Sequence, residues 1–172
     1  MASFNTLRRR LGAAIVAALK SGNAIIDEVL AGSGATLNVE LADFAHDDAE
    51  ATRQPGHCMV FYEGVDRVPF DEGENRASKR RTYIYKLLFT LWDDVGVDQP
   101  ALDLHQGLEN IFGDSRVFFR DFVTDTEGNL PAKAGRVELD EDIIEAESKT
   151  KRTLEATVRI TVGQIAPLKH VP

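Results

Sequence analysis

The sequence predicts an α+β domain with a mixed, mainly antiparallel sheet of about four to five strands and helices packed on it. The strongest evidence is Thr153–Ile165, where apolar and polar residues alternate almost without error. Such alternation is typical of a strand with one dry and one wet face. A second long strand is predicted at Arg81–Trp92, where Tyr83, Tyr85 and Leu87 share one face. The end of the chain therefore returns to complete a sheet begun in its middle.

The bulk composition indicates one soluble-type globular domain over residues 1–172. The chain has 172 residues, 43% of them hydrophobic and 28% charged, which is ordinary for a single domain with its own core. Cys58 is the only cysteine, so no internal disulfide can form. The formal net charge is −8, and this charge disfavours tight binding to nucleic-acid phosphates.

Residues 1–31 are predicted to form an N-terminal helical segment. Apolar residues from Leu7 to Leu19 follow helical spacing, which predicts an amphipathic helix over Asn5–Lys20. Ser21-Gly22-Asn23 interrupt it, and Ala24–Leu30 is expected to resume it with Ile25, Ile26 and Val29 facing the core. The apolar run after Arg8–Arg10 resembles a secretory signal, but it is too short to span a membrane.

The middle of the chain is predicted to hold two further strands and a long loop. Thr36–Leu41 alternates and His57–Tyr62 is a compact apolar run, so both are expected to be strands. Residues 65–80 lack periodicity and carry Pro69, Gly73 and mixed charges, which favours a long mobile loop. Ile84 and Leu88 on the second face of Arg81–Trp92 indicate that this face is covered too.

A well-defined helix should follow the central strand. Pro100 suits a helix start, apolar residues recur at three- and four-residue steps up to Phe112, and Gly113 is placed as the stop. The pattern of Arg116–Val123 does not decide between helix and strand. Arg136–Glu147 is an acidic stretch with few apolar anchors, and residues 166–172 are expected to be a flexible tail.

No motif in the sequence indicates a reaction. No G-x-S-x-G, Walker or phosphate-binding glycine sequence is present. His57 and Cys58 are adjacent and would point to opposite faces of a strand, and His105 lacks a nucleophile motif beside it. Two acidic groups lack the spacing of known metal loops; they are His46, Asp47, Asp48 and Glu50, and Asp93, Asp94 and Asp98. We therefore expect no catalytic residue, no cofactor, no metal site and no enzymatic activity.

One basic group is a candidate contact for a partner or a second copy. Arg76, Lys79, Arg80 and Arg81 lie within or directly after the predicted loop, where they could hold an acidic surface or a phosphate. The alternative is a solvated loop whose charges protect a strand end. Neutralising Arg76, Lys79 and Arg80 is expected to leave folding intact and to weaken assembly.

The order of these elements resembles the tail-terminator proteins of long-tailed phages, the minor tail protein U group. The matching segments are LRRRLGAAIVAAL, HCMVFY, TYIYKLLFTLW, ALDLHQGLENIF and TLEATVRITV. They extend over most of the chain, although no short signature motif is among them. The predicted loops are long for this group.

The resemblance implies a hexameric ring that caps the head-proximal end of the tail tube and contacts the head-completion or connector protein. Such a protein would be assembled in the host cytoplasm and reside in the virion. DNA would pass through the ring without specific binding, and no membrane would be involved. Two alternatives remain open: another head–tail joining or tail-completion protein, and a monomeric protein-binding module.

Overall fold

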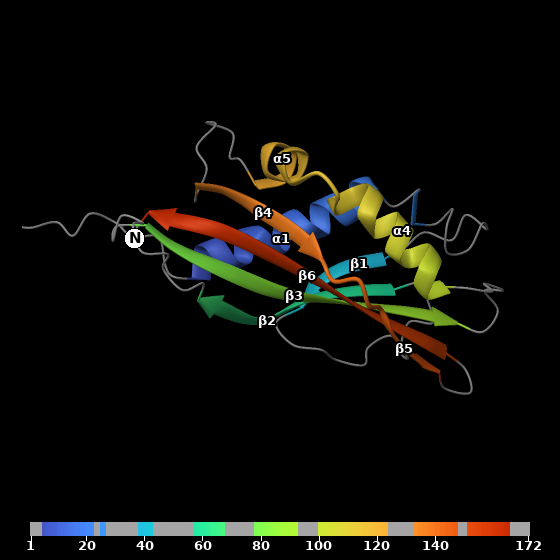
Figure 1. The fold of residues 1–172 in the computed structure, drawn as a ribbon. Coiled ribbons are helices and arrows are strands. Elements are labelled where there is room, and N and C mark those ends of the chain that lie inside the picture. Colours follow the sequence, from blue (N-terminus) through green and yellow to red (C-terminus); the bar gives the residue numbers. More distant parts are fainter. Residues whose placement is uncertain are drawn as a thin grey trace, which may run out of the picture.

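A computed structural model describes residues 5–22, 25–26, 38–42, 57–67, 78–92, 100–123, 133–147 and 151–165. These residues form one six-stranded sheet with helices on it (Figure 1). The strands are β1 (Asn38–Ala42), β2 (His57–Arg67), β3 (Ser78–Trp92), β4 (Lys133–Leu139), β5 (Ile144–Glu147) and β6 (Lys151–Ile165).

The sheet is mixed and mainly antiparallel. Its strand order is β1-β2-β3-β6-β4, and β5 also pairs with β6. Only β1 and β2 run parallel; the other described pairs are antiparallel. The predicted α+β fold is therefore confirmed, and the last strand returns to pair with the central one.

The centre of the sheet is the long pair formed by β3 and β6. Their register is unbroken from Ser78 opposite Ile165 to Trp92 opposite Lys151. Tyr85 lies opposite Val158, and both side chains are almost fully buried. The period-two alternation predicted from the sequence thus gives the correct inner face for both strands.

Helices α1 (Asn5–Ser21) and α4 (Pro100–Phe112) lie over the same side of the sheet (Figure 1). The apolar stripe of α1 packs into the core because its members recur on one side of the helix. Its buried members are Leu7, Leu11, Ala14, Ile15, Ala18 and Leu19. Helix α4 buries Leu104, Leu108 and Phe112 and ends before Gly113, as predicted.

The segment that the sequence left undecided is helical. Asp114 begins α5 (Ser115–Phe118), because its carboxylate accepts hydrogen bonds from the backbone N–H groups of Arg116 at 2.9 Å and Val117 at 3.2 Å. A short π-helix, η1 (Phe119–Val123), follows directly. Phe118 is fully buried, with its ring centroid 5.8 Å from that of Phe112.

Some element boundaries differ from the prediction. Strand β2 continues to Arg67 and β3 begins at Ser78, so both ends of the loop predicted over residues 65–80 are strand. The rest of that loop, residues 68–77, lies outside the described residues, as does the predicted tail, 166–172. The apolar spacing gave no strand signal there because Asp66, Arg67 and Ser78–Arg80 are all polar.

Two smaller predictions are also corrected. Ile26 is buried but Ile25 is 38% exposed, so only one of the two faces the core, and Val29 lies outside the described residues. The second face of β3 is covered only in part, because Ile84 and Leu88 are half-buried. Met59, which lies opposite Leu88 in β2, is nevertheless 2% exposed.

Candidate functional site

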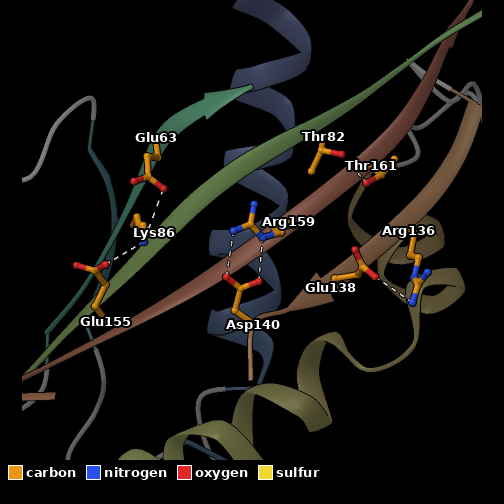
Figure 2. Close-up of polar contacts among 9 residues, drawn as sticks. All are labelled: Glu63, Thr82, Lys86, Arg136, Glu138, Asp140, Glu155, Arg159 and Thr161. Atoms are coloured by element: carbon orange, nitrogen blue, oxygen red, sulfur yellow. Dashed lines mark hydrogen bonds and ion pairs between the residues drawn. The ribbon is translucent and has the colours of Figure 1, made fainter. Parts of the chain in front are cut away.

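The sheet face opposite α1 and α4 carries a set of charged and hydroxyl side chains, which we call the polar face (Figure 2). Its members come from β2, β3, β4 and β6, and from the segment after β4. They are Glu63, Thr82, Lys86, Arg136, Glu138, Asp140, Glu155, Arg159 and Thr161. Because side chains two residues apart share a face, the wet sides of β3 and β6 build most of this surface.

Lys86 lies between two carboxylates on the polar face. Its Nζ is 3.0 Å from Glu155 Oε1 and 3.7 Å from Glu63 Oε2, on strands at either side of β3. Partial burial lowers the pKa of the ammonium, but the hydrogen bond and charge of Glu155 outweigh it, so the pKa of Lys86 is raised overall. The lysine therefore stays charged and ties three strands together.

A second ion pair lies where the strand that pairs with β6 changes from β4 to β5. Arg159 Nε lies 2.9 Å from Asp140 Oδ1, and its Nη2 lies 3.2 Å from Oδ2, a bidentate arrangement. The backbone N–H of Asp140 donates to the carbonyl of Thr157 at 3.0 Å. Asp140 lies directly after β4, so these bonds hold the chain against β6 until β5 begins.

The remaining polar contacts are short-range pairs. The hydroxyls of Thr82 and Thr161 are 2.9 Å apart on opposed strands. Arg136 Nη2 lies 2.9 Å from Glu138 Oε1, and both side chains are largely exposed. A pair of this exposure contributes about 0–1 kcal/mol, so the Arg136–Glu138 pair adds little to the stability of the fold.

All three tyrosines of the chain gather on the other face, beside the start of α1. The ring of Tyr62 lies 5.7 Å from that of Tyr85 and 6.4 Å from that of Tyr83, centroid to centroid. The guanidinium of Arg8 stacks 4.7 Å from the Tyr62 centroid, and the Tyr85 hydroxyl donates to the Arg8 carbonyl. Burial raises the pKa of Tyr62 and of Tyr85, so these two phenols stay neutral beside the start of α1.

The predicted basic group is distributed differently from the prediction. Arg76 lies outside the described residues. Lys79 and Arg80 belong to β3 rather than to the predicted loop, and Arg81 lies in the strand as predicted, opposite Arg67 on one side and Val162 on the other. The Arg81 side chain is half-buried. These three residues are therefore held in register at one end of the sheet, which sequence periodicity did not indicate for Lys79 and Arg80.

The other candidate residues bring no reactive group together in the described part of the chain. Cys58 and His57 are both buried in β2. His105 Nδ1 lies 3.8 Å from Glu109 Oε1, one turn away on α4. His46, Asp47, Asp48, Glu50, Asp93, Asp94 and Asp98 lie outside the described residues. Among those described, no three His, Cys, Asp or Glu side chains are grouped closely enough to hold a metal ion.

Comparison with known proteins gives no family for this chain. No protein-family model matches it, and no curated protein sequence matches it. Among the described helices, none combines the length and the apolar character that crossing a bilayer requires.

Proposed function

We propose that this protein is a structural assembly subunit of the phage tail-terminator type. It forms a ring, expected to be hexameric, on the head-proximal end of a tail tube and offers its outer surface to the connector or head-completion protein. Its place of action is the virion, after assembly in the host cytoplasm. It acts through shape and surface charge, and no enzymatic step is assigned to it.

The observation that carries the proposal is the long, one-sided sheet. Strands β3 and β6 pair over fifteen residues each, and helices α1 and α4 lie over one side (Figure 1). The other side presents the polar face, whose side chains are cross-linked by Lys86 and Arg159. A stiff sheet with a fixed charge pattern suits a subunit that must meet its neighbours in one geometry.

Element order supports the same class. The segments on which the family resemblance rests correspond to α1, β2, β3, α4 and β6 in that order. The net charge of −8 also suits a ring around a DNA path, because like charge keeps the duplex from adhering.

The test is imaging and weighing of the purified full-length protein, alone and with isolated tail tubes. We expect uniform rings that bind one end of a tube. Rings that bind a connector but no tube would instead support another head–tail joining or tail-completion protein. A strict monomer at every concentration that binds a protein partner would assign the chain to the binding-module class and overturn the proposal.

A further inference from the structure

The described part of the molecule has a basic and an acidic end. Arg8, Arg9 and Arg10 lie in the first turns of α1, and Arg81 lies near the start of β3; we call these four residues the arginine end. Glu141, Asp142, Glu145 and Glu147 are all exposed along and just before β5; we call these the acidic edge. Figure 1 shows the start of α1 and strand β5 at opposite ends of the sheet.

Among the described residues, β5 pairs only with β6, so the acidic edge is also an unpaired strand edge. Thr157 accepts a hydrogen bond from Asp140 on the β4–β5 side of β6. Because ladder bonds alternate with period two, Glu155 and Thr153 turn toward the same side and pair with Ile144 and Ala146. The backbone groups of Glu145 and Glu147 must then point outward, away from the sheet.

The neighbouring edge strand, β4, differs from β5 because its outward backbone groups are bonded. In β4 the outward N–H of Val137 donates to Ser115 Oγ at 3.0 Å, and the same hydroxyl donates to the Val137 carbonyl at 3.4 Å. Helix α5 therefore covers the edge of β4. All four residues of β5 are exposed, and Ile144 is 61% exposed. An exposed strand edge can pair with another chain, and charged side chains on the edge restrict which chains can approach it.

Within a single molecule, the positive charge of the arginine end is poorly balanced. The first turn of α1 contains no acidic residue, and the helix N-terminus carries a partial positive charge of its own. Arg8 stacks on Tyr62 and Arg10 donates to the Val123 carbonyl at 3.3 Å. The Arg9 side chain is exposed and has no ion-pair partner among the described residues.

Arg81 and the acidic edge are too far apart to neutralise each other inside one molecule. Glu145 lies beside Leu154 and Arg81 beside Val162, eight residues further along β6. At about 3.3 Å per residue this separation is roughly 26 Å. The Debye length is about 8 Å at physiological ionic strength, so their attraction is screened almost completely. Glu147 lies 3.0 Å from Arg152 Nε of its own chain, whereas no ion pair joins Glu141, Asp142 or Glu145 to another described residue, so these three carboxylates are the ones offered to another molecule.

We propose that the arginine end of one copy binds the acidic edge of the next copy, in a head-to-tail contact. Guanidinium groups are suited to it, because their N–H donors can bind both a carboxylate and the outward carbonyls of β5. Arg10 already makes a backbone contact of this kind within its own chain. A head-to-tail contact joins two different surfaces and closes into a ring when its rotation permits. This inference rests on the proposed ring and names its subunit interface.

A charge exchange tests the contact. Arg9→Glu and Glu145→Lys each change an exposed side chain, and each should weaken self-association of the full chain about tenfold, which corresponds to roughly 1.4 kcal/mol. The double variant Arg9→Glu/Glu145→Lys should recover most of the association, because the introduced carboxylate of one copy then meets the introduced ammonium of the next. Sedimentation velocity at about 0.15 M and about 1 M NaCl supplies the measurement.

Matched controls make the outcomes distinct. Lys20→Glu changes an exposed cation at the other end of α1, and Glu109→Lys changes an exposed anion on α4; both should associate like the parent. Rings that form equally well in all variants, or single losses that the double variant does not restore, would overturn this contact but leave the proposed function standing. Absence of any assembly in the parent would overturn both.

A duplex DNA titration covers the competing partner for the arginines. In fluorescence anisotropy with a labelled duplex, we expect Arg9→Glu to bind DNA no more weakly than the parent protein does. Tight binding that is lost in Arg9→Glu, together with a monomeric parent, would assign the arginine end to nucleic acid and refute the contact between copies.

Discussion

Gly135 is the position where the structure makes the sharpest prediction about folding. It lies in β4 where the register against β6 shifts between Lys133 and Arg136. A Cβ atom built on Gly135 would lie 1.7 Å from the carbonyl oxygen of Thr161 and 3.0 Å from the Cα of Val162. Both of these atoms belong to the backbone of β6, so no flexible side chain can move aside.

The expected cost of Gly135→Ala follows from that distance. Contacts of a real Cβ essentially never fall below 3.0 Å, so β4 would have to retreat by roughly 1.3 Å at this point. Forced overpacking costs about 1–3 kcal/mol, and the loss of a ladder hydrogen bond adds about 1 kcal/mol. A total near 3 kcal/mol lowers the melting temperature of a chain of this size by roughly 6–12 °C.

Thermal melts followed by circular dichroism measure the effect, and Gly64→Ala is the matched control. Gly64 also lies at a register shift, in the pair of β2 with β3, but no heavy atom lies within 4 Å of a Cβ built there. Its substitution should change stability by less than about 0.5 kcal/mol. The reasoning fails if Gly135→Ala melts with the parent, or if both variants lose the same amount.

Three further substitutions test the core, the tyrosine cluster and the polar face. Val158→Asp buries a carboxylate at a fully buried site and should destabilise by more than about 4 kcal/mol; a cooperative melt near the parent temperature would contradict the strand phase. Because the pKa of Tyr85 is raised, its unfolded form loses a proton above about pH 10 while the folded form keeps it, so stability falls with rising pH by up to about 1.4 kcal/mol per unit. In urea titrations, Tyr85→Phe should reduce the fall in stability above about pH 10. It should also cost about 1 kcal/mol at neutral pH, because the hydrogen bond to the Arg8 carbonyl is lost. An unchanged fall at alkaline pH would show that Tyr85 is not its source. Arg159→Met removes the half-exposed pair with Asp140 and should cost about 1 kcal/mol or less in chemical denaturation, so a loss of several kcal/mol would show that this pair does more than join β4 to β6.

The sequence predicted the interior of this fold well because period and burial agree there. The inner residues of β6 alternate strictly, and Val158 and Ile160 are fully buried. The stripe of α1 and the spacing in α4 were equally direct, because one face of each helix must be apolar to pack on a sheet. These features follow from local patterns that need no knowledge of partners.

The edge formed by β4 and β5 could not be predicted in the same way. Strands β4 and β5 arise from an acidic stretch in which only Val137 is buried, so apolar alternation gave no signal. Their pairing depends on β6, far away in the sequence, and on side-chain bonds such as those of Ser115 and Asp140. The same reason hid the polar face, whose ion pairs exist only once the strand register is known.

The difference between the edge strands β4 and β5 bears directly on how copies could meet. An unprotected edge pairs with any other edge, which produces aggregates rather than one defined assembly. The β4 edge is closed by Ser115, whereas β5 is open but carries Glu145 and Glu147, which repel a second copy of the same edge. In the proposed contact, this charge keeps like edges apart while the arginine end is accepted. A subunit built in this way favours the unlike, head-to-tail contact that a closed ring needs over the like-with-like contact that would end growth at two copies.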